Sequence, residues 1–169
     1  ARAAALGLGL EECARQMRYA FLEETAEQEG CTLIATGHQA GDNAETVLMH
    51  LIRGCGLHGL TGIPVRRGKI VRPMLEISRA EIEAYLAAHR VPHVEDESNG
   101  DESYTRNKVR RRLIPLLEEL NPRAAEHIAA TARRLAEDEG ELARQGAELA
   151  RQARERPDGW EIPARALTD

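Results

Sequence analysis

Apolar residues recur at helical spacing between residues 10 and 29, and glutamates occupy the outward positions near the end of this stretch. The pattern predicts an amphipathic helix that ends at Gly30. Residues 31–36 then read CTLIAT, a short apolar run with β-branched side chains. Such a run is most simply a buried strand of a parallel sheet. A helix followed by such a strand favours the α/β class.

The alternation of helix and strand continues along the chain. A second helix is predicted over residues 42–53, a glycine-rich loop over 54–69, and a second strand in KIVRPML at 69–75. Ser78 would begin a third helix, because Glu81 follows it at the spacing of a capping box. The glycines of the loop formally match GxGxxG, but they follow a helix rather than a strand, so we reject a dinucleotide site.

The last third of the chain is predicted to be helical. One helix would end near residue 120, and Asn121 and Pro122 would start a long helix to about residue 155. Its apolar residues form a narrow stripe with a seven-residue spacing, which suits a connecting helix better than a coiled coil. Residues 156–159 are typical of a turn.

Composition and charge narrow the class of protein. With 169 residues, 42% hydrophobic and 30% charged, the chain is neither disordered nor membrane-spanning, and we expect no membrane partner. A formal charge of −5 excludes a uniformly basic nucleic-acid coat. The three cysteines share no CxxC spacing, which argues for a reducing compartment and against a zinc site, an iron–sulfur cluster or a disulfide framework. The first ten residues lack the features of a signal peptide, so we expect a cytoplasmic protein.

The sequence GHQAGDNAET lies where the first predicted strand passes into a helix. Open parallel sheets bind ligands at this edge, and His38, Asp42 and Glu45 would gather there. A histidine and two carboxylates beside a helix N-terminus could position phosphates, an amine nucleophile and Mg²⁺, with Asp42 as a metal ligand. The alternative is structural, since Asp42 as N-cap and Glu45 at N3 would also form a capping box.

The charge of the chain changes sign after residue 105. Residues 106–112 carry five positive side chains, whereas the stretch before them is acidic. Arg106 and Arg110 stand four residues apart and would share one helical face, where they could clamp a phosphate backbone. The alternative is that they pair with the acidic residues between 95 and 102. The spacing leaves both interpretations open.

Several motifs follow one another in the order of a known enzyme family. They run from RYAFLEE through TGHxxxDxxET, RGCGLHGLTG, IVRPML, SRAEIEAYL and EDESN to YTRNKVRRRLIPLLEELNP, and cover about residues 10–150. In this succession the chain resembles the bacterial tRNA(Ile)-lysidine synthases, which are PP-loop ATPases. The resemblance implies an adenine-nucleotide α-hydrolase-like fold, that is a Rossmann-like parallel sheet, here partial and with a C-terminal helical extension.

The resemblance also implies a reaction and its residues. Such enzymes use ATP and Mg²⁺ to adenylate C2 of the wobble cytidine in tRNA(Ile) with a CAU anticodon, and the amino group of L-lysine attacks that carbon. His38, Asp42 and Glu45 match the active-site cluster around ATP, metal and lysine. Gln39 and Gly41 depart from the pattern, since many members have a second His and an additional Asp there. The later matching positions, near nucleotide and tRNA, are Arg72, Arg106, Asn107 and Arg110.

One family motif does not occur among these 169 residues, the SGGxDS loop whose amides hold the pyrophosphate of ATP. We therefore expect residues 1–120 to be the C-terminal part of the catalytic domain, 121–156 a connecting helix, and 157–169 a linker with the start of a following domain. The isolated chain is expected to be an inactive fragment. A homodimer is an open option.

Two other functions stay open. A tRNA-thiolating PP-loop ATPase would share the adenylation step, but such enzymes usually need paired cysteines, which this sequence lacks. A non-catalytic tRNA-binding fragment would agree with the missing loop. The motif TGHxxxDxxET favours an enzyme.

Overall fold

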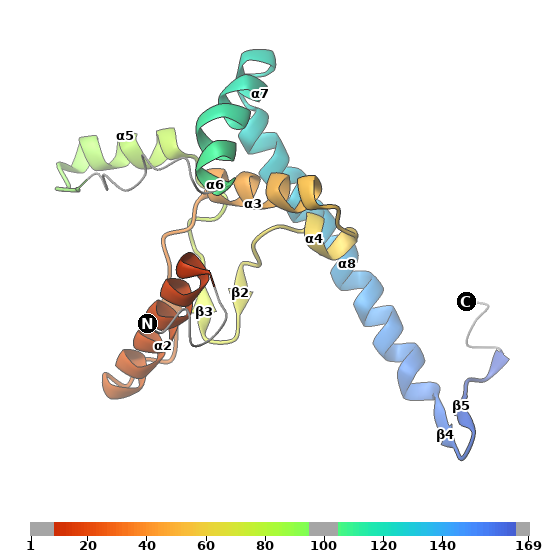
Figure 1. Cartoon of the computed structure of the whole chain (residues 1–169). Helices are drawn as coiled ribbons and strands as arrows, with labels where there is room; N and C mark the ends of the chain where they lie inside the picture. Colours follow the sequence, from red (N-terminus) through yellow and green to blue (C-terminus); the bar gives the residue numbers. More distant parts are fainter. Residues whose placement is uncertain (1–8, 95–104, 165–169) are drawn as a thin grey trace. The chain divides into compact units, whose positions relative to one another are not determined.

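The computed structural model describes residues 9–94 and 105–164 of the chain (Figure 1). The chain forms two compact units. The first contains Ala1–His38 and Pro64–Leu75, and the second contains Gln39–Ile63 and Glu76–Asp169. Each unit has a hydrophobic cluster of its own. Within the described ranges, no helix combines the length and the apolar character that a membrane crossing requires.

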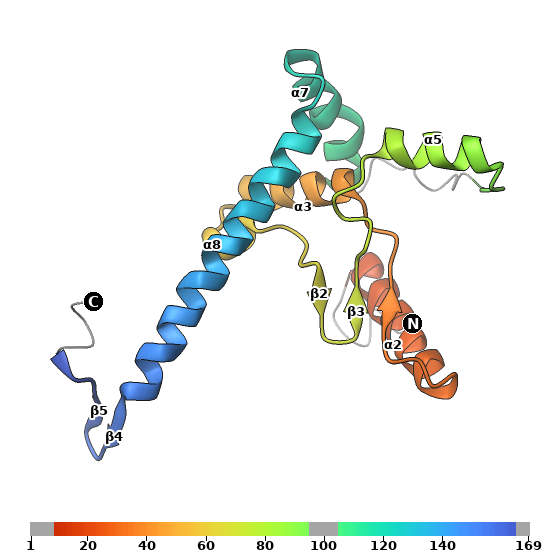
Figure 2. The ribbon, with the colours of Figure 1, turned by 180° about the vertical axis from the view of Figure 1, so that it is seen from behind.

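In its described residues, the first unit pairs one helix with a three-stranded sheet (Figures 1 and 2). Helix α2 (Leu10–Gln28) precedes strand β1 (Ile34–Ala35), which pairs in parallel with β3 (Ile70–Val71). Strand β2 (Arg66–Arg67) lies on the other side of β3 in antiparallel pairing. The β1–β3 pair confirms the predicted parallel pairing. The antiparallel neighbour was not predicted.

The core of the first unit lies between α2 and the sheet. Ala26 of the helix packs with Ile34 and Ile70, which face each other across the parallel pair. Leu22 and Tyr19, one and two turns earlier on α2, pack against this cluster.

The apolar face predicted for this helix included Met17 and Phe21, but these side chains are 50% and 65% exposed. The face of α2 that meets the strands is therefore a different one, and the predicted face is wrong.

Both strands of the parallel pair are shorter than predicted. Residues 31–33 are exposed and precede β1. At the end of β3, Arg72 N donates to the Val65 carbonyl, and Pro73 has no N–H to continue the ladder. Gly68, with φ of +60°, makes the tight turn from β2 to β3. Gly68 was visible in the sequence as a turn residue. Strand β2 before it was not predicted, because its two residues show no apolar alternation.

The second unit is mainly helical. Its core contains Ala44 and Leu48, which pack against Val109 and Ile114 from a segment more than sixty residues later. Partly buried apolar side chains surround this cluster, among them Ile128. The elements of the unit are α3 (Ala40–Arg53), α4 (Leu57–Leu60), α5 (Arg79–His89), α6 (Thr105–Lys108), the π turn η2 (Val109–Leu113), α7 (Ile114–Leu120), α8 (Ala124–Gln152), β4 (Arg154–Arg156) and β5 (Gly159–Glu161).

Helix α3 begins earlier than the sequence predicted. Gln39 is its N-cap and accepts a hydrogen bond from Gly41 N at 2.8 Å, while Asp42 accepts from Gln39 N at 3.0 Å. These contacts form a capping box in which Asp42 occupies N3. The predicted alternative, with Asp42 as N-cap and Glu45 at N3, is therefore wrong. Glu45 lies one turn further into the helix and is not needed to cap it.

Two other helix starts can be compared with their predictions. The capping box of α5 is confirmed, since Ser78 N donates to Glu81 at 2.8 Å and Glu81 N donates to Ser78 Oγ at 3.2 Å. Helix α8 starts later than predicted, with Arg123 as its N-cap. Asn121 precedes the helix and accepts from Arg123 N through its side chain. The predicted turn at 156–159 joins β4 to β5 as a hairpin.

The basic segment contains a π turn that the sequence did not predict. In η2 the N–H of Ile114 donates to the carbonyl of Val109, five residues earlier, instead of the four of an α-helix. A π turn brings residues five apart to nearly the same side. Val109 and Ile114 are accordingly both buried in one cluster.

Replacing Gly62 with alanine should destabilise the second unit. Gly62 has φ of +70°, and a Cβ there would lie 2.1 Å from Asn43 Oδ1. Gly54→Ala is a matched control, because Gly54 has φ of +80° but open space around it. We expect Gly62→Ala to lower the free energy of unfolding in urea by about 1 to 3 kcal/mol more than the control. Equal losses in the two variants would contradict the clash.

Candidate active site

The acidic part of the candidate site comes from the start of α3. Asp42 lies in its first turn, and Glu45 follows three residues later on the same helical face. The Glu45 side chain is buried at 3% exposure, whereas that of Asp42 keeps 16%. Two carboxylates in such positions need positive partners, because an uncompensated buried charge costs several kcal/mol.

Two arginines, 61 to 68 residues further along the chain, supply these partners. Arg106 donates from Nε to Glu45 at 2.7 Å and from Nη2 to Asp42 at 3.0 Å. Arg110 donates to Glu45 from Nε at 2.5 Å and from Nη2 at 3.1 Å, and its Nη2 also reaches Asp42 at 3.0 Å. Each arginine bridges both carboxylates. We call Asp42, Glu45, Arg106 and Arg110 the carboxylate–arginine cluster.

The carboxylate–arginine cluster has no net formal charge, because its two carboxylates balance its two guanidiniums. Burial alone would lower the pKa of Arg110, but its hydrogen bond to Glu45 and the charges of Glu45 and Asp42 outweigh burial and raise that pKa. Arg110 therefore stays charged. The acidic residues of 95–102, the alternative partners considered from the sequence, fall outside the described residues.

The carboxylate oxygens of this cluster are already engaged. Asp42 Oδ1 accepts from both arginines and Oδ2 from Gln39 N, and both Glu45 oxygens accept from guanidinium groups. Mg²⁺ needs oxygen ligands in near-octahedral geometry. Carboxylate oxygens that already accept hydrogen bonds from guanidinium groups do not fit the role of Mg²⁺ ligands. Among the described residues, no three His, Cys, Asp or Glu side chains are grouped to hold a metal ion. Ligation of Mg²⁺ by Asp42 stays a prediction, and it requires the arginines to move away.

Two of the predicted site residues belong to the first unit. His38 is half-buried, and its Nδ1 lies 3.0 Å from Thr36 Oγ1. Arg72 is 2% exposed and donates from Nη1 to the Pro64 carbonyl at 2.5 Å. Its Nε is buried, and no group among the described residues accepts a hydrogen bond from it. An unused buried donor is costly and calls for an explanation, so Arg72 is a candidate ligand contact.

Asn107 is the remaining predicted residue and is half-buried in α6. The second unit thus brings together four of the seven predicted residues as one cluster, Asp42, Glu45, Arg106 and Arg110.

A profile of the PP-loop domain family matches residues 1–117. The chain belongs to the PP-loop domain family.

Curated relatives of this PP-loop domain chain share a name, tRNA(Ile)-lysidine synthase. The chain is 46% identical to the protein from Parabacteroides distasonis over 129 residues and 47% identical to that from Geobacter sulfurreducens over 134 residues. A third relative, from Chlorobaculum tepidum, is 47% identical over 131 residues. These matches cover 76 to 78% of this chain but 28 to 39% of the relatives. The chain therefore spans about a third of their length.

A solved structure agrees with the family assignment at the level of the fold. The U34-tRNA thiolase NcsA from Methanococcus maripaludis, with its 4Fe–4S cluster, superimposes with a TM-score of 0.56 at 20% sequence identity. The match covers 73% of this chain and 43% of the thiolase. At this identity the likeness shows the fold alone, and it confirms the predicted α/β, adenine-nucleotide α-hydrolase-like class.

Sequence reasoning missed two supporting residues in this PP-loop domain chain. Asn43 is 4% exposed, and its Oδ1 accepts from Ile63 N at 2.7 Å, which ties the segment after α4 to the start of α3. Gln39 is the N-cap of α3 and donates its N–H to Asp42. A glutamine is not among the preferred N-caps, so its role had no sequence signal. For Asn43, the one hint in the sequence was its position between Asp42 and Ala44.

Glu45→Gln should strongly destabilise the second unit. The change removes one of two negative charges facing Arg106 and Arg110, and breaking a buried pair costs about 3 to 5 kcal/mol. Glu148→Gln is the control, because Glu148 pairs with Arg151 on the exposed surface of α8, where about 0 to 1 kcal/mol is expected. Urea unfolding of both variants measures the difference. A Glu45→Gln protein as stable as the control would show that the cluster does not hold α3 to the basic segment.

Proposed function

We propose that this chain is part of a cytoplasmic tRNA(Ile)-lysidine synthase, an ATP-dependent carbon–nitrogen ligase. Its substrates would be L-lysine and tRNA(Ile) with a CAU anticodon. The observation that carries the proposal is the 46 to 47% identity, over about three quarters of this chain, to relatives that bear this enzyme name. PP-loop ATPases use ATP, and Mg²⁺ enters the proposal as the ion that accompanies it.

The proposed reaction has two steps. The C2 oxygen of the wobble cytidine attacks the α-phosphorus of ATP, and pyrophosphate leaves. The amino group of lysine then adds to C2, AMP departs with the oxygen, and the nitrogen loses a proton. Negative charge on phosphate must be stabilised in both steps, and the attacking amine must be held in place.

The carboxylate–arginine cluster supports this chemistry. The protein itself orients Arg106 and Arg110, because Glu45 fixes both guanidiniums from a buried position. Fixed donors stabilise developing phosphate charge without reorganisation. Asp42 is the more exposed carboxylate of the pair, so we assign it to the lysine ammonium and Glu45 to the positioning of the arginines. No step here depends on a metal bound to Asp42.

The other predicted residues complete the proposal. The Nε donor of the buried Arg72 has no acceptor within the described part of the chain, which suits a contact with a phosphate or carbonyl oxygen. His38 and Asn107 are half-buried polar side chains that we assign to the nucleotide and tRNA, as the family resemblance implied.

In the complete product of the gene, Asp42→Ala or Glu45→Ala should abolish lysine transfer to a tRNA(Ile) transcript. Both changes remove carboxylates that orient the arginines or the amine. Ser78→Ala is the matched control, because it removes a helix cap in the same unit at a cost of about 1 kcal/mol and touches no proposed site residue. If folded Asp42→Ala and Glu45→Ala variants keep their activity, the role of both residues is structural and not catalytic.

The isolated 169-residue chain should bind Mg-ATP weakly or not at all. It contains no SGGxDS loop, and the arginines of the carboxylate–arginine cluster cannot replace several backbone N–H donors around a pyrophosphate. Isothermal titration calorimetry of the folded chain tests this, with circular dichroism as the check on folding. A dissociation constant of about 1 µM would show that the loop is dispensable.

A further inference from the structure

Tyr19 of helix α2 holds two arginines in the first unit. The guanidinium carbon of Arg15 lies 5.4 Å from the centroid of the Tyr19 ring, and that of Arg67 lies 5.3 Å from it. A guanidinium at this distance is attracted to the electron-rich face of an aromatic ring. Arg15 belongs to α2 and Arg67 to β2, so the fold brings together two cations that are more than fifty positions apart in the sequence. We call Arg15 and Arg67 the Tyr19 arginine pair.

The register of the sheet explains why Arg67 reaches the tyrosine. Arg67 lies opposite Ile70 in the antiparallel β2–β3 pair. Residues that lie opposite each other in such a pair point to the same face of the sheet. Ile70 packs with Ala26 of α2, and Tyr19 packs against the same cluster. Arg67 is therefore on the face that α2 covers, and the core holds the half-buried Tyr19 in place.

The Tyr19 arginine pair carries positive charge without a carboxylate partner. Within residues 9–94 and 105–164, neither Arg15 nor Arg67 takes part in an ion pair, and the interaction that each makes is the one with the ring. Glu12, three residues before Arg15, instead accepts a hydrogen bond from Gln16 at 3.4 Å. Two like charges held beside one ring repel each other, so an anion is their natural complement.

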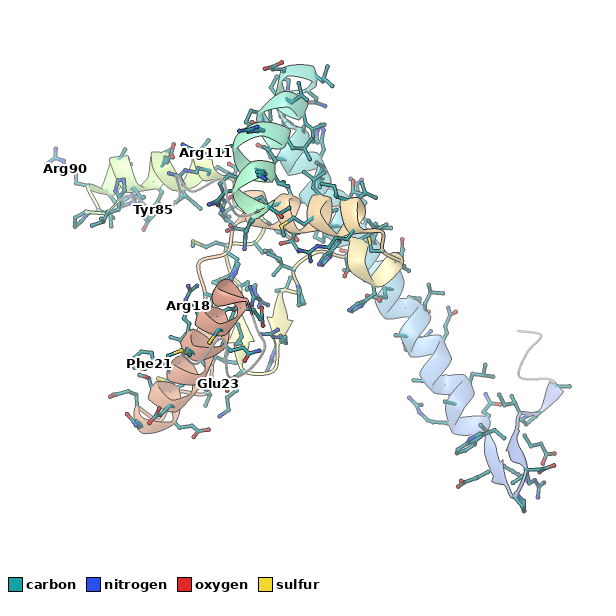
Figure 3. All side chains as sticks on the ribbon, viewed as in Figure 1. Arg18, Phe21, Glu23, Tyr85, Arg90 and Arg111 are labelled. Atoms are coloured by element: carbon teal, nitrogen blue, oxygen red, sulfur yellow. The ribbon has the colours of Figure 1, made fainter. Side chains whose placement is uncertain are left out.

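The acidic surface of α2 lies further along the helix. Figure 3 shows Glu23 beyond Arg18 on this helix, in the direction of its last turns. There Glu27 accepts a hydrogen bond from Lys69 at 3.4 Å, so the charge of this lysine is balanced. The contact between α2 and the sheet thus has a balanced end and an unbalanced end, and the unbalanced end is the Tyr19 arginine pair.

We propose that the Tyr19 arginine pair binds phosphate groups in the backbone of RNA. The proposal rests on the proposed function for the identity of the RNA, which would be tRNA(Ile). A guanidinium suits phosphate, because its planar fork donates two parallel hydrogen bonds to phosphate oxygens. Arg67 is exposed and Arg15 is half-buried, so both can meet a ligand from solvent.

Tyr19 acts in this proposal as a positioning residue. Its ring restrains both guanidiniums, which reduces the entropy that they lose when they bind. Contacts between arginine and backbone phosphate fix the position of an RNA strand and carry no sequence information. The Tyr19 arginine pair therefore contributes affinity and orientation, and recognition of the anticodon lies elsewhere.

The test measures binding of a tRNA(Ile) transcript to the 169-residue chain across a salt series. Arg15→Gln with Arg67→Gln removes the charge of the pair. Arg90→Gln with Arg134→Gln is the matched control, because it removes the same charge from exposed side chains of the second unit that make no ion pair with a described residue. We expect the first double variant to lose about two units of salt slope and about tenfold in affinity at low salt, and the control to lose less than about twofold.

Variants of the tyrosine separate positioning from charge. Tyr19→Phe keeps the ring and should bind RNA as the wild type does. Tyr19→Leu keeps an apolar side chain against the core but removes the ring, and should lower the affinity about threefold with little change in salt slope. Circular dichroism and urea unfolding check that each variant folds. If folded Tyr19→Leu binds as tightly as Tyr19→Phe, the ring has no positioning role.

Three outcomes overturn the proposal for the arginines. The Arg15→Gln, Arg67→Gln variant could keep the wild-type salt slope, the control could lose as much, or the wild-type chain could bind no tRNA at low salt. A fourth outcome assigns the pair to a nucleotide instead, namely loss of affinity for inorganic triphosphate without loss of affinity for RNA. Arg15→Lys with Arg67→Lys keeps the charge and should keep the slope, which shows that the loss in the glutamine variant is electrostatic.

Failure of the proposed function would look different. If the complete gene product forms no lysidine but its RNA binding still depends on the Tyr19 arginine pair, the function falls and the surface stands. If it forms lysidine and the Arg15→Gln, Arg67→Gln variant keeps the wild-type KM for tRNA(Ile), the surface falls and the function stands.

Discussion

The buried Glu45 carboxylate is the interaction on which the second unit depends. It is 2% exposed and accepts hydrogen bonds from two guanidinium groups that come from another part of the chain. Buried ion pairs are weak sources of net stability, because desolvation offsets most of the attraction, but they penalise any arrangement that leaves one partner alone. Glu45 therefore acts mainly as a constraint. It fixes where the segment of Arg106 and Arg110 must lie.

The apolar contacts beside Glu45 agree with that constraint. Ala44 and Leu48 flank it on α3 and pack with Val109 and Ile114 on either side of Arg110. An ordinary α-helix would turn Val109 and Ile114 to different sides, since residues five apart differ by about 140° at 3.6 residues per turn. The π turn lets the same segment satisfy both the ion pairs and the core. Insertions of this kind are frequent at functional sites.

The charge balance of the site follows from this geometry. Arg106 and Arg110 lie on the side of their segment that faces α3, where Asp42 and Glu45 balance their charges. Under the proposed function, this arginine pair is suited to hold a reacting phosphate in a fixed direction.

Features that depend on near neighbours or on a succession of motifs could be predicted from the amino-acid sequence. The capping box of Ser78 and Glu81 is local, the parallel pairing follows from short apolar runs, and the motif order identifies the PP-loop family. Asp42 and Glu45 could be named together as site residues because residues three positions apart on a helix lie on the same face. Their partners could be identified only in the folded chain, since the contacts with Arg106 and Arg110 join residues more than sixty positions apart and leave no periodic pattern in the sequence. The π turn has the same origin, because its backbone conformation is stabilised by long-range packing and ion pairs rather than by the propensities of the residues within it.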